Sequence, residues 1–542
     1  MSASKTIIKL VLSIGFIRRF YRGQLRIRLR GYRYLQRDGK QSLIYDINGA
    51  LRACKLVIPN ERFSKAIFGA AFENAELVVR QRLSGREGIV TRALLFAAGQ
   101  KESRVTLPLP SELLQEVESF GFLTNRFESF LSLYLRALKD LFFGSLQIII
   151  NLKNNFSFLK RSVLPVENFI YFCDLVHTNL PQPVGNKHSY CVINWYLQWQ
   201  GKPKDLHVIA HGVAGYSDSH IGDTRLIYRR SPLPDLVGAL SFMRYVFWAI
   251  KAISISAYDL LFGHWWHAML LREASFAALV RCGDKRMLAR QYFFHNSRPY
   301  EPLWTYELQG HGSEAIHYWY STNSETLMKP NGSRPLNTHY SLSNWPRHLV
   351  WDEAQANFVR HCQENGSIIE VIGPIWFQDN GRDLPKFSSP VVAVFDVQPV
   401  RDSLFGSLAP YSDFHTPQNS IAFLNDIFAE TLANNFSVIV KPKRGIGSQL
   451  HPRYREFLKS STSCRRIYVV DSGISAFRVI ERADAVISLP FTSTAMIAKS
   501  LGKPSVYFDP SGTQVLNKIS ARGLEVLCNR LELRHWIERL RF

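Results

Sequence analysis

Short apolar runs alternate with helical patterns in the last third of the chain. The runs Ile467–Val470, Ala485–Leu489 and Ser505–Phe508 are rich in β-branched or aromatic residues and have the length of buried strands. The patterns Ala476–Arg482 and Ser493–Leu501 repeat apolar positions at helical spacing between them. This alternation predicts parallel strands joined by crossover helices, as in a doubly wound sheet.

The same pattern extends upstream to a predicted domain boundary. The predicted strands Val391–Phe395 and Ser437–Val440 flank a predicted helix, Ile421–Asn434, whereas residues 377–390 are rich in glycine, proline and aspartate. Such a segment is typical of a junction between domains. We therefore predict a C-terminal α/β domain over residues 390–535.

Residues 38–380 are predicted to form an N-terminal α/β domain, because a chain of 542 residues is too long for one ordinary core. Helices are predicted at Glu112–Phe120, Phe127–Phe143 and Glu353–Gln363. The predicted strands are Phe169–Leu175, Tyr190–Trp195, His207–Ile209, Leu303–Leu308, His348–Trp351 and Ile368–Ile372. The fold class is thus α/β, with two Rossmann-like doubly wound domains.

The most apolar long segment lies at residues 236–271 and predicts a helical insertion in the first domain. Arg244, Lys251, Asp259, His264 and His267 interrupt it, which is too often for a transmembrane span. Its aromatic residues suit a bilayer interface and a helical core equally well.

Charge is concentrated at the N-terminus. Residues 1–37 hold ten lysines or arginines and no acid, out of a formal net charge of +22. The apolar run Ile7–Ile17, of about 11 residues, is shorter than the roughly 20 that span a bilayer, and its apolar residues share one helical face. We predict a basic amphipathic segment that binds an anionic membrane surface. A signal peptide, which Arg18-Arg19 disfavour, and a core helix are the alternatives.

The seven cysteines show no CxxC spacing, and histidines and cysteines form no cluster with metal-ligand spacing. We expect a protein of the reducing cytoplasm, peripheral at the inner face of the cytoplasmic membrane, without disulfides and without a metal site.

Cations and hydroxyl groups recur where predicted strands end. A cationic string follows strand Ser437–Val440, and hydroxyl residues open helix Ser493–Leu501. The free N–H groups at a helix start and nearby cations can hold a phosphate at the carboxyl edge of such a sheet. For Lys443 and Arg444 a solvated loop is the alternative. The predicted diphosphate site, which needs no metal, consists of Lys441, Lys443, Arg444, Thr492, Ser493 and Thr494.

Two histidines are candidates for contact with a ligand. His311 lies between Gly310 and Gly312 after the predicted strand Leu303–Leu308, and Glu307 can orient it or act itself. Glycines allow close backbone approach, and an imidazole can act as acid or base near neutral pH. His211 follows strand His207–Ile209 in the same manner. A turn packed for structural reasons is the alternative for both.

The order of these features resembles the donor-binding half of GT-B glycosyltransferases. The resemblance covers residues 390–515 and, more loosely, 290–380. It is greatest to the bacterial enzymes that assemble capsule, lipopolysaccharide and teichoic-type surface polymers. It rests on the ordered set Lys441-Pro442, Asp471, Ala483-Asp484, the Ser/Thr-rich turn and Gly502-Lys503-Pro504.

This resemblance implies a GT-B-like cleft between the two domains, a nucleotide-sugar donor, no further cofactor, and a lipid-linked or growing surface glycan as acceptor. Lys441 with Ser493 and Thr494 would hold the donor phosphates. Base or ribose would lie against the turn of Asp471, Ser472 and Ile474. His311, with Glu307, would face the cleft as the catalytic base, and Gly310, Gly312 and His211 would lie on the acceptor side.

Two departures from the family pattern bear on the mechanism. The usual Lys-Pro-His-Pro string appears as Lys441-Pro442-Lys443-Arg444, and Ala495-Met496-Ile497-Ala498 stands where retaining enzymes carry a glutamate. We therefore expect inversion by direct displacement with a single base.

Other functions fit the same sequence. A nucleotide-sugar 2-epimerase and a CDP-alcohol phosphotransferase use the same architecture, and a scaffold of polysaccharide assembly would need no catalysis. A nucleic-acid-binding protein is disfavoured, because the charge lies at one terminus beside an apolar run and no recognition module is visible.

Overall fold

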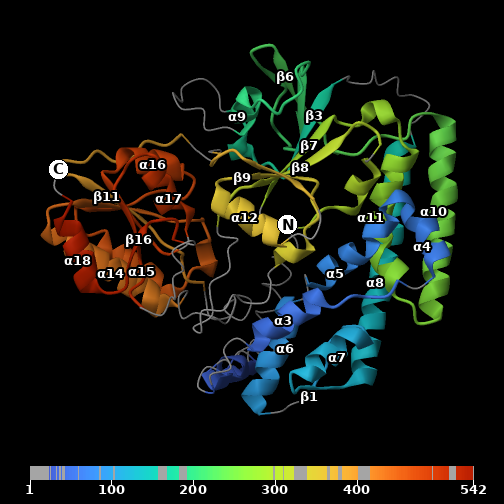
Figure 1. Cartoon of the computed structure of the whole chain (residues 1–542), viewed down its shortest axis with the longest axis horizontal. Coiled ribbons are helices and arrows are strands. Elements are labelled where there is room, and N and C mark those ends of the chain that lie inside the picture. Colours follow the sequence, from blue (N-terminus) through green and yellow to red (C-terminus); the bar gives the residue numbers. More distant parts are fainter. Residues whose placement is uncertain are drawn as a thin grey trace.

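The computed structural model describes residues 23–24, 26–31, 33–35, 38, 43–58, 60–84, 87–101, 104–156, 168–181, 192–296, 300–308, 310–322, 339–362, 366–375, 381–400, 416–490, 492–511 and 521–540. The chain folds into two α/β domains, each built on a mainly parallel sheet (Figure 1). The predicted fold class is therefore confirmed. The predicted membrane segment Ile7–Ile17 lies outside the described residues.

The C-terminal sheet has six parallel strands in the order β13-β12-β11-β14-β15-β16. The chain starts in the middle, runs to one edge and then returns to the other side, so the strand order reverses between β11 and β14. Ligands of open α/β sheets bind beside this point. The strands are β11 (Val391–Phe395), β12 (Ser437–Lys441), β13 (Ile467–Val469), β14 (Ala485–Ser488), β15 (Ser505–Phe508) and β16 (Glu525–Leu527).

Helices cover both faces of this sheet. α14 (Pro417–Ala433), α15 (Pro452–Ser461) and α18 (Arg530–Glu538) pack on one face. α16 (Ala476–Arg482) and α17 (Ser493–Ser500) pack on the other. The predicted elements are confirmed to within one residue, except that α14 begins four residues before the predicted start. Thr416 caps that helix and a proline occupies its first turn, which extends it upstream.

The N-terminal sheet has eight strands in the order β10-β9-β8-β7-β3-β4-β6-β5, and all neighbours are parallel except β5 and β6. Helix α9 (Val192–Gln198) and helix α12 (Glu353–Cys362) join its strands. The strands are β3 (Phe169–Cys173), β4 (Val208–His211), β5 (Ser219–Ile221), β6 (Thr224–Tyr228), β7 (Gln291–Asn296), β8 (Glu314–Trp319), β9 (Arg347–Val350) and β10 (Ile368–Val371).

Two predicted strands of this domain are wrong. Leu303–Leu308 forms a 3-10 helix, η4, whose six side chains are all buried against α11 and its surroundings. The predicted strand Tyr190–Trp195 overlaps helix α9, where Val192, Ile193 and Tyr196 are buried on one helical face. The strands β7 and β8, on either side of η4, were not predicted.

The remaining part of the first domain is almost entirely helical (Figure 1). Helix α11 (Trp266–Cys282) is buried and packs against two long helices, α8 (Arg126–Asn155) and α10 (Gly238–Leu261). Helices α10 and α11 follow β6 and precede β7 in the chain, and they overlap the segment 236–271. The other elements are α3 (Leu43–Ala53), α4 (Glu61–Phe68), η1 (Gly69–Asn74), α5 (Ala75–Ser84), α6 (Glu87–Gln100), α7 (Ser111–Ser119) and the two-residue strands β1 (Arg104–Val105) and β2 (Leu123–Thr124).

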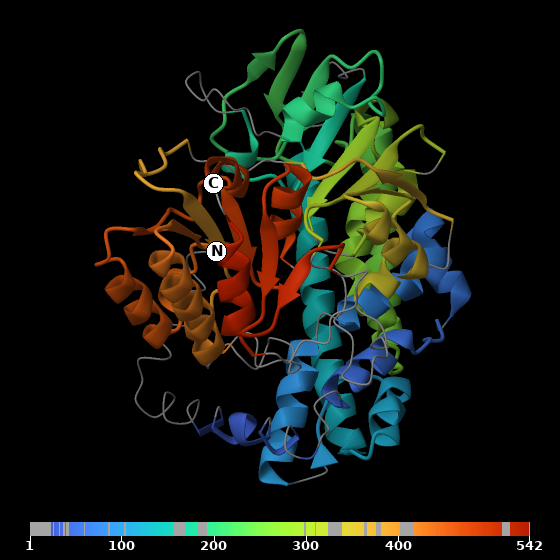
Figure 2. The same cartoon turned by 60° about the vertical axis from the view of Figure 1, so that its left-hand side comes forward.

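The two domains contact each other directly (Figure 2). Trp351 and Ile375 of the first domain belong to the same buried apolar cluster as Phe395 and Ile474 of the second. An ion pair between Asp352 and Arg522, 2.6 Å from Oδ2 to Nε, joins the domains at the edge of this cluster. The two domains therefore share an interface made of an apolar cluster and an ion pair.

Candidate functional site

A pocket of about 200 Å³ lies between the two domains. Tyr320, Trp351 and Ile375 line it from the first domain, where they follow β8, β9 and β10. The second domain contributes the ends of β11 and β12, the turn after β13 and the start of α17. The pocket thus lies at the carboxyl edge of both sheets and beside the switch point of the second.

Lys441 is the last residue of β12, and its side chain lines the pocket. Its side chain is only 5% exposed, and Nζ donates to the carbonyl oxygens of Ser472 at 3.0 Å and Pro442 at 2.9 Å. Burial lowers the pKa of Lys441 to about 8, although nearby Asp471 and Asp396 act in the opposite direction. An ammonium group has three donors, so one remains for a ligand.

The start of α17 offers backbone donors to the same pocket. Thr492 is the N-cap residue, but its hydroxyl donates to the carbonyl of Leu489 at 2.8 Å and does not cap the helix. Thr494 Oγ1 lies 2.9 Å from the hydroxyl of Ser488, the last residue of β14. The first N–H groups of α17, including that of Ser493, are therefore available to donate hydrogen bonds to water or to an anion.

The turn after β13 forms another wall. Ser472 and Ile474 line the pocket, and the carbonyl of Ser472 holds Lys441. The carboxylate of Asp471 faces elsewhere. It accepts hydrogen bonds from the backbone N–H of Gly473 and from Arg382, both at 2.7 Å. Asp471 therefore shapes the turn and ties it to the segment between the domains.

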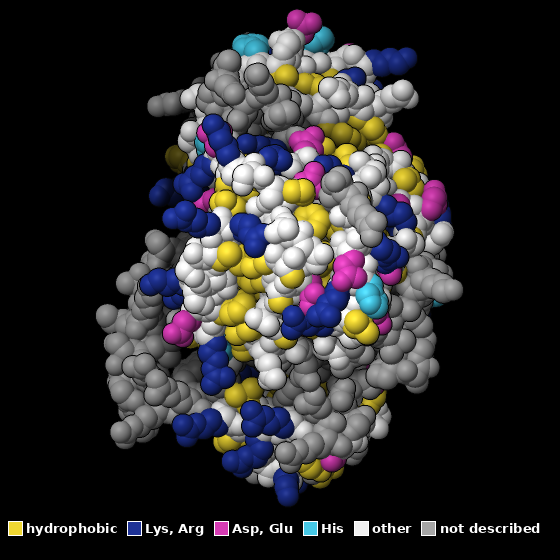
Figure 3. Space-filling model, turned by 90° about the vertical axis from the view of Figure 1, so that its left-hand side faces the viewer, with side chains coloured by type: hydrophobic (Ala, Val, Ile, Leu, Met, Phe, Trp, Pro, Cys, Tyr) yellow, Lys and Arg dark blue, Asp and Glu magenta, His cyan; other side chains and the backbone are white. Residues whose placement is uncertain are grey.

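The two other predicted cations lie at different places. Lys443 lines the pocket and keeps an exposed surface, while neighbouring protein atoms and the charge of Arg444 lower its pKa. Arg444 lies in an adjoining, more open hollow of about 480 Å³, together with Arg455. Ser472 belongs to both hollows. Figure 3 shows the molecule from the side of the C-terminal domain, where lysine and arginine side chains are more frequent than aspartate and glutamate.

Asp396 is a pocket residue that the sequence did not single out. It follows β11 directly, is 2% exposed, and accepts a hydrogen bond from Tyr454 through Oδ2. Its Oδ1 is buried with no partner among the described residues. Burial raises the pKa of Asp396 to about 6, while the bond from Tyr454 and the charge of Lys441 lower it. A polar residue directly after an apolar strand is the sequence signal that could have indicated it.

His311 and Glu307 lie at the opposite edge of the first sheet, which corrects the expected placement. The turn that holds His311 leads into β8, whereas the pocket begins after β8 ends, and a strand of six residues spans roughly 20 Å. His311 is exposed, and Glu307 is paired with Arg281 of α11 at 2.9 Å. The error follows from η4, because a strand there would have ended at the carboxyl edge.

Gly310 and Gly312 share this position before β8, and both have positive φ angles of 80° and 71°. They form the turn that brings the chain from η4 into the strand. His211, in contrast, ends β4 at the carboxyl edge. Its Nδ1 accepts from the N–H of Val213 at 3.2 Å, so the proton of the neutral ring lies on Nε2, and burial lowers its pKa. It does not line the pocket.

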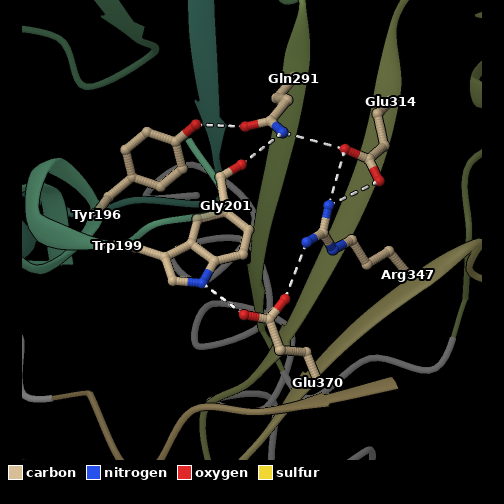
Figure 4. A network of polar contacts seen from close by, with 7 residues as sticks. All are labelled: Tyr196, Trp199, Gly201, Gln291, Glu314, Arg347 and Glu370. Carbon is tan, nitrogen blue, oxygen red and sulfur yellow. Dashed lines mark hydrogen bonds and ion pairs between the residues drawn. The ribbon is translucent and has the colours of Figure 1, made fainter. Parts of the chain in front are cut away.

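The amino edge of the first sheet is closed by a polar network (Figure 4). Arg347, the first residue of β9, binds Glu314 of β8 at 3.2 Å and Glu370 of β10 at 2.9 Å. Gln291 donates to Glu314 at 3.0 Å, and Trp199 donates to Glu370 at 2.8 Å. These mutually satisfied groups fasten neighbouring strands together, so this edge is structural and the carboxyl edge is the one open to a ligand.

Among the described residues, no group of three or more histidine, cysteine, aspartate and glutamate side chains lies close enough to hold a metal ion. The positive groups around the pocket are instead Lys441, Lys443 and the start of α17.

Residues 248–537, a little over half of the chain, match the profile of the family described as "Polysaccharide biosynthesis PFTS motif protein". The four letters of that motif occur in this region at Pro490-Phe491-Thr492-Ser493. Thr492 and Ser493 are the residues that open α17 at the pocket. No curated protein sequence matches the chain at a significant level.

Several solved structures are similar to the chain. The wall teichoic acid polymerase TagF is 11% identical, with 75% of this chain and 88% of TagF covered at a TM-score of 0.37. TarM is 13% identical at a TM-score of 0.26, with 46% of this chain covered, and the chain spans 47% of the length of TarM. The calicheamicin glycosyltransferase CalG4 is 12% identical, with 69% and 90% covered at a TM-score of 0.31.

Proposed function

The chain belongs to the family of polysaccharide biosynthesis PFTS motif proteins, and from this premise we propose that it is a glycosyltransferase. It transfers a sugar from a nucleotide-activated donor to a lipid-linked or growing surface glycan, such as a capsule or lipopolysaccharide precursor. The observation that carries the proposal is the pocket in which Lys441, the start of α17 and Asp396 meet between two doubly wound domains.

The donor's diphosphate binds at Lys441, Ser493 and Thr494. A buried ammonium group and the N-terminal N–H groups of a helix together stabilise a doubly charged leaving group. The proposal assigns this charge stabilisation to the protein and needs no metal ion for it. The adjoining hollow beside Ser472 gives the nucleoside room beyond the diphosphate.

The sugar then lies toward Tyr320 and Trp351, whose aromatic rings provide a surface for a pyranose face. Asp396 is the only carboxylate among the described residues that line the pocket. Its Oδ1 has no hydrogen-bond partner among the described residues, and Asp396 therefore replaces His311 as our candidate base. The acceptor hydroxyl gives its proton to Oδ1 as its oxygen bonds to the anomeric carbon. The bond from that carbon to the phosphate oxygen breaks, and the nucleoside diphosphate leaves with the electron pair, which inverts the anomeric centre.

The test uses Lys441→Ala and Ser493→Ala with a panel of UDP-, GDP-, CDP- and CMP-activated donors. Removing the ammonium group of Lys441 is expected to lower transfer at least about a hundredfold while circular dichroism stays unchanged. Removing the hydroxyl of Ser493 is expected to lower transfer less, because the backbone N–H of this residue remains. Lys459→Ala and Ser460→Ala in α15 are matched controls, since both side chains are exposed and lie off the pocket. Full transfer by both pocket variants would refute the assignment.

The same panel separates the other functions that the sequence allowed. An epimerase would convert a donor without any acceptor, and a phosphotransferase would move an alcohol phosphate in place of a sugar. A scaffold would leave every donor unchanged and would show no heat of binding with any nucleotide.

The cellular place of the protein is part of the proposal. A lipid-linked acceptor is presented at a membrane, so we place the enzyme in the cytoplasm at the inner face of the cytoplasmic membrane. Support comes from the basic sequence of residues 1–37, which carries ten cations and no acid.

A further inference from the structure

Two adjacent helices of the first domain present apolar side chains to solvent along their whole length. On α10 the exposed apolar residues Leu240, Met243, Phe247 and Ile250 recur every three or four positions, and Tyr258 and Leu261 continue the stripe after the exposed Ser254. Phe247 is 65% exposed and Leu261 is 79% exposed. A stripe of this regularity is what a helix buries when it meets an apolar environment.

Helix α8 carries a second stripe of the same kind. Its exposed members include Phe127, Leu131, Leu135, Phe142, Leu146 and Ile149. The two helices are antiparallel neighbours: Asn151, near the end of α8, donates to Tyr245 at the start of α10 at 2.9 Å, whereas Ala137 packs with Leu260. Both also pack on α11. Figure 1 shows α10 on the side of the molecule that faces away from the C-terminal domain.

We propose that these two stripes, the α8–α10 face, form a docking surface for a bilayer that contains anionic lipids. This inference rests on the proposed function, in which a lipid-linked acceptor brings the enzyme to a membrane. Its physical basis is separate, because it uses no residue of the pocket.

The charges around the face favour lipid headgroups as the partner. Arg244 and Lys251 of α10 and Lys139 and Lys153 of α8 are exposed beside the stripes, and of the two acids of α8, Glu128 is exposed near the helix start and Asp140 is partly buried. The acid of α10, Asp259, is buried and paired with His267 at 2.5 Å. Long cationic side chains beside an apolar stripe reach up to anionic headgroups while the stripe enters the acyl region.

The same charges disfavour two other occupants. A second copy docked through this face would bring its own cations against those of the first, which costs free energy. The N-terminal apolar run Ile7–Ile17 contains Lys9 and is followed by Arg18-Arg19, so it also lacks the acids that would complement the face.

The α8–α10 face lies on the membrane and does not cross it. Helix α10 is the one helix of the described residues that is long and apolar enough for a span by length and composition. Its inner side, however, is fastened to protein: Trp248 donates to the carbonyl of Ile67 at 3.0 Å, and Asp259 is held by His267. A helix bound in this way on one side can immerse only its outer half in lipid.

The test is flotation of the full-length protein with vesicles of phosphatidylcholine, with and without phosphatidylglycerol. Phe247→Ser with Ile250→Ser on α10, and Phe142→Ser with Ile149→Ser on α8, are each expected to lower the partition coefficient by about tenfold or more. The matched control is Leu531→Ser with Leu501→Ser, which changes exposed apolar residues of the C-terminal domain. Because all of these side chains are exposed, the fold should tolerate the changes.

Two further arms distinguish the origin of binding. Lys251→Ala is expected to weaken binding to the anionic vesicles by about fivefold and to leave binding to pure phosphatidylcholine unchanged. Brominated lipids are expected to quench the added fluorescence of Phe247→Trp and not that of Leu531→Trp. Alkaline carbonate should release the bound protein.

Flotation of the α8 and α10 serine variants at the wild-type level would overturn the proposal, and would assign membrane binding to residues 1–37. Retention after carbonate would overturn the surface position of α10. A change of oligomeric state in these variants without any change in flotation would mean that the face binds a second copy. Soluble donor turnover, measured with a short soluble acceptor, should stay at the wild-type level in every variant, so failure of the docking surface and failure of the transferase proposal are separate results.

Discussion

Donor affinity should fall as pH rises from 7 to 9, because Lys441 loses its proton in that interval. The pKa of Lys441 is lowered to about 8 by burial, and a nucleoside diphosphate binds the charged ammonium group. The perturbation is therefore pH itself, applied to the wild type and to the variants Lys441→Met and Lys441→Arg.

The magnitude follows from the charged fraction. With a pKa of about 8, about nine-tenths of the molecules carry the charge at pH 7 and about one-tenth at pH 9. Apparent affinity is proportional to this fraction, so it should decline about tenfold, or about 1.4 kcal/mol. An ordinary lysine with a pKa near 10.4 would change by only a few per cent over the same interval.

Calorimetric titration with the preferred nucleoside diphosphate measures the effect. Lys441→Met should bind weakly at all pH values without this decline, and Lys441→Arg should also be flat because the guanidinium stays charged. Any titration of the nucleotide affects all three proteins equally. A flat wild-type profile, or equal slopes for the wild type and Lys441→Met, would refute the phosphate role of the buried amine.

Two other predictions concern buried carboxyl groups. Tyr454→Phe removes the hydrogen bond that lowers the pKa of Asp396, so the acidic limb of the pH–rate profile should move to higher pH; an unmoved limb would exclude Asp396 as the base. Burial raises the pKa of Glu301 to about 8, so its neutral form is favoured in the fold. Its contribution to stability is present below the unfolded pKa near 4.3 and is lost at about 1.4 kcal/mol per unit as pH rises toward 8. Glu301→Gln should therefore stabilise the protein against urea more at pH 8 than at pH 5, and an equal effect at both would contradict this reasoning.

The elements that were predicted in the C-terminal domain match the structure almost residue by residue, whereas α15, β16 and α18 were not predicted. Its strands are continuous apolar runs because helices cover both faces of the sheet, and glycine, proline or charge marks each end. Lys441 and Thr494 belong to different crossover units, yet strand order brings both to one edge, as their positions after β12 and β14 predicted.

The first domain was harder to predict because its helices and its sheet pack into one common core. Leu303–Leu308 alternates apolar and polar residues like a strand, but all six side chains are buried against α11, so the alternation does not report a sheet face. This one error moved His311 to the wrong edge. Asp396 and Tyr454 are 58 residues apart, and no local pattern reveals that a carboxylate and a phenol will meet.

The α8–α10 face shows a different limit of sequence analysis. The apolar segment 236–271 was compatible with either a core or a bilayer interface. The structure shows that one helix, α11, takes the core position, whereas α10 has most of its length exposed. Hydropathy gives the amount of apolar surface, but only packing decides which part of it remains uncovered.

The pocket's walls belong to separate sheets, since Tyr320 and Trp351 follow strands of one and Lys441 ends a strand of the other. A ligand bound by both walls is lost when either domain unfolds, so it couples the unfolding of the two domains. Calorimetric unfolding peaks that are separate for the two domains without a ligand should therefore merge when a nucleotide sugar is added. Such merging would show that both walls bind the ligand.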